Sequence, residues 1–127
     1  MHLDSQEVFS DGQAIAGAVV FSTNSFKFGK GDALLNPVFV AEVAENFAGG
    51  TGVEVELQTA TDAAFTTPVT LFKAPVVLAD LKKGNKVVIV RVPYGNLGFQ
   101  RVKYTPTGTF TAGKFDTYLA PQVDLAN

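Results

Sequence analysis

The sequence contains no cysteine and no tryptophan, and its only histidine is His2. Without cysteine, the chain forms no disulfide bond, no thiolate metal site and no cysteine nucleophile. A single histidine near one end excludes a histidine-rich metal site within one chain, and it nearly excludes a Ser-His-Asp triad. Many common catalytic and metal-binding arrangements are therefore absent.

Charge is also scarce. Charged residues make up 17% of the 127 residues and the formal net charge is −2, whereas charged residues are about 25% of an average domain. Nothing resembles the basic surface of a protein that binds nucleic acid. The low charge leaves much weakly polar surface, which suits a protein that lies against another protein.

Long apolar runs are missing as well. No segment approaches the roughly 20 apolar residues of a transmembrane helix, so we expect no membrane association. The first seven residues, MHLDSQE, have neither the basic region nor the apolar region of a secretory signal. Together with the absence of cysteine, this predicts a protein made in a cytosol, or a mature fragment.

The residues that are abundant favour β-strands. The chain has 17 valines, 12 threonines and 11 phenylalanines, and 12 glycines and six prolines interrupt it at short intervals. This spacing leaves room for short strands and little room for long helices. The candidate strands cover residues 16–22, 25–28, 37–44, 53–59, 69–73, 76–81, 86–92, 99–105 and 110–119.

These strands predict one all-β domain over residues 14–120, with an N-terminal arm at 1–13 and a C-terminal tail at 121–127. We expect a two-sheet, jelly-roll-like β-sandwich of about eight strands, with extended N- and C-terminal arms. An immunoglobulin-like sandwich is the competing architecture, although the Cys…Trp…Cys pattern of that fold is missing.

Two strands have a pattern that predicts their faces. Residues 53–59 alternate strictly, so their valines and leucine should face the core while Glu54, Glu56 and Gln58 should be exposed. Residues 86–92 contain four consecutive β-branched residues, which predicts a central strand covered on both faces.

Three features invite a chemical interpretation. Glu54 and Glu56 lie about 7 Å apart on one strand face, where they could bind calcium or serve in acid–base chemistry, or simply face solvent or a partner. The Gly29–Asp32 segment lacks the pattern of a phosphate-binding loop and fits a hairpin turn. His2 could be a ligand only where a three-fold axis brings three copies together. No catalytic constellation emerges, and we do not expect an enzyme.

Arg91, Arg101 and Lys103 fall on neighbouring candidate strands, and the last two share a face. They form either a small basic patch for an acidic partner or a set of charges that pairs with Glu54 and Glu56 across the sheet. The sequence leaves both interpretations open.

Three groups of residues carry a resemblance to a known family. They are the segment Phe9-Ser10-Asp11-Gly12-Gln13-Ala14, the pattern of Glu56-Leu57-Gln58-Thr59 followed by Asp62, Phe65, Pro68 and Leu71, and the series Arg101, Tyr104, Gly108, Thr111-Ala112-Gly113 and Phe115. In that order they resemble the cement, or decoration, proteins of tailed-phage capsids, in particular the small jelly-roll cement proteins of short-tailed phages. The resemblance runs from about residue 9 to residue 119.

The resemblance implies a homotrimer that binds the outer surface of the virion capsid and clamps neighbouring major capsid protein subunits, with no catalysis and no cofactor. We expect residues 1–14 and the loops at 29–36 and 45–52 to make these contacts, and residues 104–115 to contribute to the trimer. Deletion of residues 1–10 should then weaken capsid binding and leave the fold intact. The candidate contact residues are Leu3, Asp4, Val8, Phe9, Lys30, Asp32, Phe47, Arg101 and Tyr104.

Two other classes of function remain open. One is a carbohydrate- or receptor-binding β-sandwich module, against which the absence of tryptophan argues. The other is a cupin-like enzyme, which would need core histidines that the chain does not have.

Overall fold

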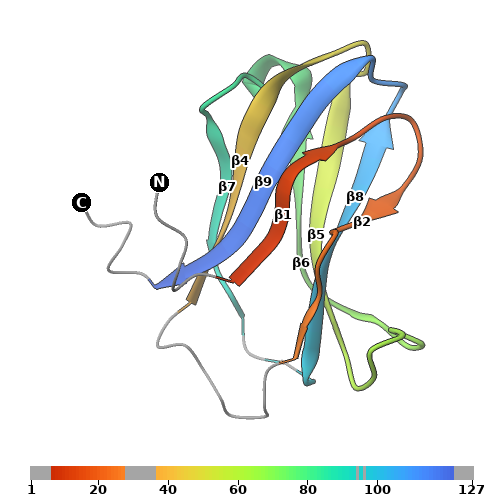
Figure 1. Ribbon diagram of the computed structural model, residues 1–127, viewed down its shortest axis with the longest axis vertical. Coiled ribbons are helices and arrows are strands. Elements are labelled where there is room, and N and C mark those ends of the chain that lie inside the picture. Colours follow the sequence, from red (N-terminus) through yellow and green to blue (C-terminus); the bar gives the residue numbers. More distant parts are fainter. Residues whose placement is uncertain (1–6, 28–36, 94, 96, 122–127) are drawn as a thin grey trace.

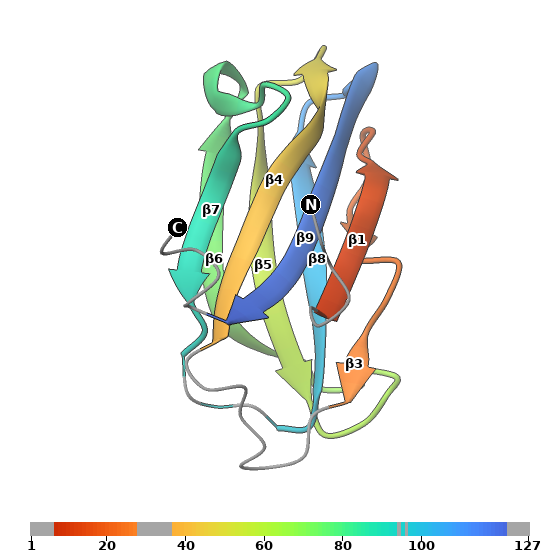
Figure 2. The same ribbon diagram turned by 60° about the vertical axis from the view of Figure 1, so that its left-hand side comes forward.

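The computed structural model describes residues 7–27, 37–93, 95 and 97–121. These residues form two antiparallel β-sheets that pack face to face, and they contain no α-helix (Figures 1 and 2). The only helical turn among them is a short 3₁₀ helix at Leu78–Asp80.

The first sheet has the strand order β1 (Glu7–Ala14), β9 (Ala112–Pro121), β4 (Pro37–Ala48) and β7 (Lys86–Arg91). The second sheet has the order β2 (Val20–Phe21), β8 (Phe99–Thr107), β5 (Gly52–Ala60) and β6 (Val69–Val77). The short strand β3 (Phe26–Lys27) also pairs with β8, at the end opposite to β2, so β2 and β3 act as two pieces of one edge strand.

The strand pairing identifies a jelly roll. The pairs β1–β9, β2/β3–β8, β4–β7 and β5–β6 are nested, as if one long hairpin had been folded over on itself. Such nesting gives the double-sheet jelly-roll arrangement. In the immunoglobulin alternative the first two strands are neighbours in one sheet, whereas the neighbour of β1 is β9. The prediction of an all-β, two-sheet jelly-roll sandwich is confirmed.

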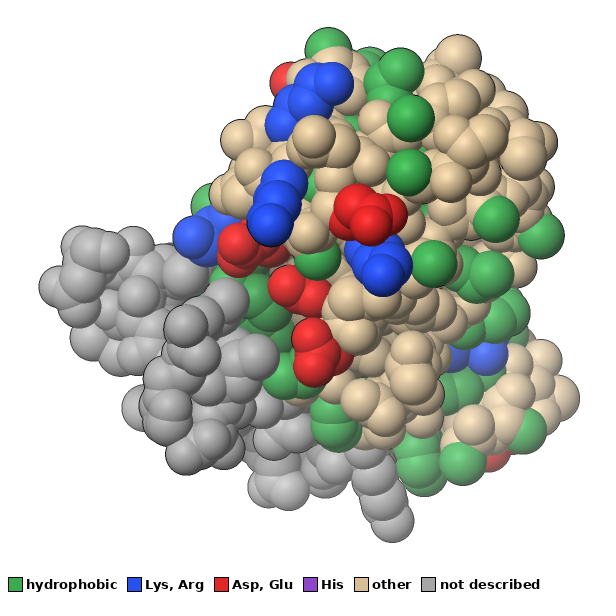
Figure 3. All heavy atoms as spheres, turned by 45° about the horizontal axis from the view of Figure 1, so that its top comes forward, with side chains coloured by type: hydrophobic (Ala, Val, Ile, Leu, Met, Phe, Trp, Pro, Cys, Tyr) green, Lys and Arg blue, Asp and Glu red, His purple; other side chains and the backbone are tan. Residues whose placement is uncertain are grey.

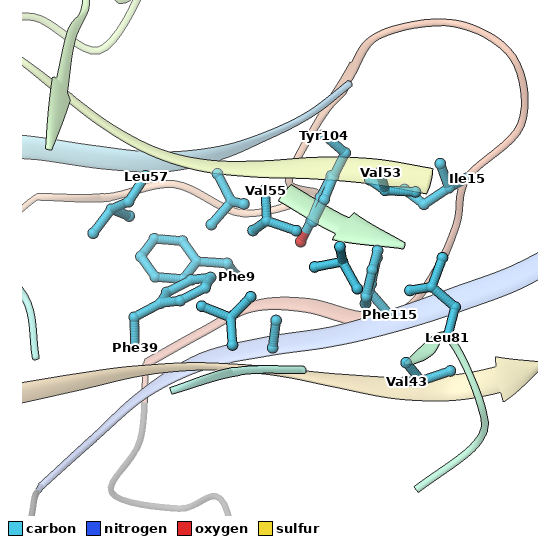
Figure 4. Close-up of a cluster of buried hydrophobic side chains, with 14 of the residues drawn as sticks. Phe9, Ile15, Phe39, Val43, Val53, Val55, Leu57, Leu81, Tyr104 and Phe115 are labelled. Carbon is cyan, nitrogen blue, oxygen red and sulfur yellow. The ribbon is translucent and has the colours of Figure 1, made fainter. Parts of the chain in front are cut away.

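Aromatic rings and aliphatic side chains together fill the space between the sheets (Figure 4). Phe39 packs edge-on against Phe72 with ring centroids 5.3 Å apart, and it lies 6.2 Å from Phe9. Tyr104 stacks on Phe115 at 5.5 Å. Burial of one such side chain contributes roughly 1.5–3 kcal/mol, so this core is a main source of stability.

The N-terminal boundary predicted from the sequence is wrong for residues 7–13. They form most of β1, which pairs with β9, and both Phe9 and Ser10 are fully buried. The expectation that deletion of residues 1–10 spares the fold fails for the same reason, because the deletion would remove core contacts. Residues 1–6 and 122–127 lie outside the described residues, so the terminal arms are not tested there.

Two other local predictions are also corrected. The strand β7 lies at the edge of the first sheet, with Ile89 54% exposed, and is not central. Its β-branched residues alternate, because Val88 faces the core while Ile89 faces outward. The strand β6 continues through Pro75, which a sheet tolerates because β6 is also an edge strand.

The Tyr104 hydroxyl group joins the two sheets inside the core. Ser10 Oγ donates to Gln13 Oε1 at 2.5 Å, which uses the single hydroxyl proton of Ser10. The Tyr104 hydroxyl therefore donates to Ser10 Oγ at 2.7 Å and accepts from Thr117 Oγ1 at 2.6 Å. Because Tyr104 lies on β8 and its two partners lie on β1 and β9, this chain of hydrogen bonds crosses the sandwich.

We predict that Tyr104→Phe destabilises the protein by about 1–3 kcal/mol, because the buried Thr117 hydroxyl loses its partner. Urea unfolding measures the change in the free energy of unfolding. A Tyr104→Phe protein as stable as wild type would show that the hydroxyl chain contributes little.

The same hydroxyl predicts a loss of stability at alkaline pH. Burial raises the pKa of Tyr104 from 10.0 to about 12, against the opposing effect of its hydrogen bonds to Ser10 and Thr117. The folded state therefore holds this proton more tightly than the unfolded state. Its contribution is complete below pH 10 and is lost as the pH rises through 12. Wild type should lose more stability than Tyr104→Phe over this range. Tyrosinate absorbance at 295 nm can follow the titration, since the chain has no tryptophan.

Gly113 is required by a close ring contact. It has a φ of +141°, and a Cβ atom at this position would lie 2.3 Å from the Phe47 ring. Gly84 is a matched control, because it has a φ of +91° and open space around it. We expect Gly113→Ala to cost about 1–3 kcal/mol more than Gly84→Ala, through steric overlap in the core. Thermal unfolding of both variants tests this, and equal losses would contradict it.

Candidate interaction surface

The sequence-predicted contact residues divide into three groups. Phe9, Phe47 and Tyr104 are buried in the core, so their prediction as surface contacts is wrong. Their positions on strands point them between the sheets, where Phe47 packs on Phe115 with ring centroids 4.9 Å apart.

Val8 and Arg101 lie on the outer faces of the first and second sheets, respectively. Leu3, Asp4, Lys30 and Asp32 lie outside the described residues, as does His2. The structure therefore brings no two of the predicted contact residues together on one surface among the residues that it describes.

The outer face of the second sheet carries a row of charged residues. Glu56 on β5 lies directly between Lys73 on β6 and Lys103 on β8. In the next row along the strands, Gln58 lies opposite Arg101. Of the predicted pairings with the glutamates, the register therefore supports only that of Lys103 with Glu56, because Glu54 lies opposite Thr105 and Arg101 lies opposite Gln58. Arg91 is not part of this group, because β7 belongs to the other sheet.

Glu56 and Gln58 are buried on this face, with exposures of 4% and 6%, although the alternation predicted exposed side chains. Both are held by hydrogen bonds. Gln58 Nε2 donates to Glu56 Oε2 at 3.2 Å, and the Thr70 hydroxyl donates to the same carboxylate oxygen. A carboxylate engaged in this way is a structural group, which argues against the calcium or acid–base interpretation of the Glu54–Glu56 pair.

Arg101 is the most constrained cation on the face. Its Nε donates to Gln58 Oε1 at 2.9 Å. Its guanidinium carbon lies 3.8 Å from the ring centroid of Phe21 and 4.3 Å from that of Phe65. Burial lowers the pKa of Arg101, and the nearby negative charge of Glu56 opposes this effect. We refer to Arg101, Gln58, Phe21 and Phe65 as the Arg101 cluster.

Phe65 reaches the cluster through an unusual backbone conformation. Its φ is +53°, which bulky residues rarely adopt. Hydrogen bonds within its own loop support this conformation, because the Asp62 carboxylate accepts from the Thr66 amide at 3.2 Å and from the Thr66 hydroxyl at 2.7 Å. The Thr66 hydroxyl also lowers the pKa of Asp62. Sequence reasoning missed Phe21 and Phe65 as partners of Arg101, because nothing in their spacing indicates the contact.

The outer face of the first sheet is apolar. Val8, Tyr118, Val40 and Ile89 lie opposite one another on the four consecutive strands and form a row across the sheet. Val38 and Ala120 extend this group into a second hydrophobic cluster, on the face that points away from the core. We refer to the four residues that cross the sheet as the apolar row.

Figure 3 shows one face of the molecule, on which acidic and basic side chains lie close to one another near the middle and a wide neighbouring area carries few charges. Within the described residues, no group of three or more His, Cys, Asp or Glu side chains could hold a metal ion. No helix in the same part of the chain is long and apolar enough to cross a membrane.

Comparison with known proteins gives one family. A family model described as Bbp16 matches residues 9–119, which cover nearly all of the sandwich. No curated protein matches the chain. The chain therefore belongs to the Bbp16 family, whose name suggests a phage-related protein.

Proposed function

We propose that this protein is a structural capsid cement protein, which binds the outside of a phage head and stabilises contacts between neighbouring major capsid subunits. The observation that carries the proposal is the apolar row, which gives the first sheet apolar residues on both of its faces. Val40 and Tyr118 in the middle of the row are already buried within the chain, whereas Ile89 at its edge is 54% exposed, so Ile89 is the part of the row that a partner protein can cover. The Bbp16 family, with its phage-related name, adds support.

Rigidity also suits this role. A clamp between capsid subunits must resist deformation, and the aromatic core and the Tyr104 hydrogen bonds join the two sheets directly. Scarce surface charge lowers the cost of removing water from a protein–protein interface. The role requires no catalytic step, no cofactor, no nucleic acid and no membrane.

Assembly as a homotrimer would strengthen binding, since three linked copies engage a symmetric surface together. The protein would be made in the host cytoplasm and then join the outer surface of the virion capsid. Light scattering tests the trimer through a native mass of three times the 13.4 kDa chain mass. A different mass would contradict the trimer and leave head binding to be judged by sedimentation.

The cement function itself is tested with phage heads that lack the protein. Purified protein should sediment with such heads, reach saturation at a fixed ratio to the capsid protein, and raise the temperature at which the heads release their DNA. Free protein that stays in the supernatant at all concentrations would contradict the proposal. Binding on a glycan panel in place of head binding would favour the carbohydrate-binding alternative.

Ile89 gives a sharper test, because it ends the apolar row at an exposed edge. We expect Ile89→Lys to fold normally and to weaken head binding about tenfold, the effect of losing roughly 1.4 kcal/mol at an interface. Val69→Lys is the matched control. Val69 is 46% exposed on β6 of the other sheet. Equal head binding by both variants would exclude the apolar row from the interface.

A further inference from the structure

We propose that the Arg101 cluster is a carboxylate-binding site, and that its ligand is an acidic segment of the protein partner. The site itself depends only on residues of this chain. The identification of the partner as a capsid subunit rests on the proposed function.

Arg101 has hydrogen-bonding capacity that its own chain does not use. A guanidinium group has five N–H donors, one on Nε and four on the two Nη atoms. The Nε donor is used by Gln58 Oε1. The Nη atoms make no hydrogen bond to any residue in the described part of the chain. Arg101 is partly exposed, so these four donors remain for a ligand.

The orientation of the guanidinium group is fixed before any ligand arrives. Two aromatic rings lie within 4.3 Å of its central carbon, and Gln58 holds its Nε edge. The edge that carries both Nη atoms is not used by these contacts. It has the fork geometry that binds both oxygens of one carboxylate. A side chain already held in its binding orientation loses little entropy when the ligand binds.

Charges of both signs surround Arg101. Lys73 and Lys103 flank Glu56 in the row next to Arg101. Glu54 lies on the same strand, and Asp62 lies in the Phe65 loop, so these carboxylates balance the three cations. Glu56 accepts hydrogen bonds from Gln58 and Thr70 and does not occupy the Nη edge of Arg101. This edge is therefore open to a carboxylate from a partner.

The strained Phe65 supports the same conclusion. Its positive φ brings the ring against the guanidinium group, and the Asp62–Thr66 hydrogen bonds maintain that conformation. Residues in rare backbone conformations gather at ligand-binding positions, where the surrounding structure holds them. Phe65 is itself buried at 5% exposure, whereas Phe21 is 42% exposed and is the ring of this pair that an acidic peptide can contact.

The direct test uses the full-length protein and a hexaglutamate peptide at low salt. The NMR signal of the Arg101 Nε–Hε group should shift in a saturable manner with hexaglutamate and stay unchanged with hexaglutamine. An unchanged signal with both peptides would overturn the proposal. Equal affinity for inorganic phosphate would overturn its carboxylate specificity.

Variants separate the fork geometry from simple charge. Arg101→Lys keeps the charge and loses the fork, and should bind hexaglutamate at least about tenfold more weakly. Arg101→Gln should lose binding, while Lys86→Gln, which removes one positive charge from β7 on the other sheet, should not. Wild-type affinity in Arg101→Lys would show that only charge matters and would contradict the site.

Binding to heads distinguishes this site from the proposed function. If wild type binds hexaglutamate but does not sediment with heads, the cement function fails and the carboxylate site stands. If Arg101→Lys and wild type sediment equally with heads, the capsid subunit is not the source of the acidic segment.

Discussion

The structure depends on one constraint, which is that the hydroxyl group of Tyr104 is buried and must be hydrogen-bonded. Its partners, Ser10 and Thr117, come from the two neighbouring strands β1 and β9 of the opposite sheet. The register of β1 shifts on both sides of Ser10, and these shifts accompany an inward Ser10 side chain where regular alternation after Phe9 would point it outward. The first strand of the jelly roll is thus linked to the second sheet through this phenol inside the core, in addition to its pairing with β9 and to its hydrogen bonds with Phe21 and Asn24.

The two outer faces of the sandwich differ in chemistry. On the first sheet, apolar side chains meet across all four strands. On the second sheet, polar side chains form a network in which Gln58 links Glu56 to Arg101. The apolar face and the polar network both depend on the nested strand order, because this order places residues from the beginning and the end of the chain on adjacent strands. A contact such as that between Phe21 and Arg101 therefore joins positions 80 residues apart.

Much of the fold could be predicted from the sequence, since strict alternation in residues 53–59 and the glycine and proline positions define most strands and their inward residues. The sequence could not reveal which outward-facing side chains are buried, or where each strand lies within its sheet. Glu56 and Gln58 are buried because they hydrogen-bond across the sheet, and this depends on register. The strand β7 is apolar in composition and yet lies at an edge, because its place is decided by the nesting of the whole chain. Arg101 was identified as a candidate contact residue, whereas its aromatic neighbours were not, because their contacts span distant segments.

The proline within β6 has a consequence for copies of this protein held at high local concentration. An edge strand exposes main-chain amide and carbonyl groups that can pair with the edge of another molecule. Pro75 lies within β6, two residues before its end, and has no amide hydrogen, so the β6 edge cannot present a continuous series of donors. Pairing between the β6 edges of neighbouring molecules is therefore disfavoured. Copies of the protein can lie close together without joining their second sheets into a fibre through this edge.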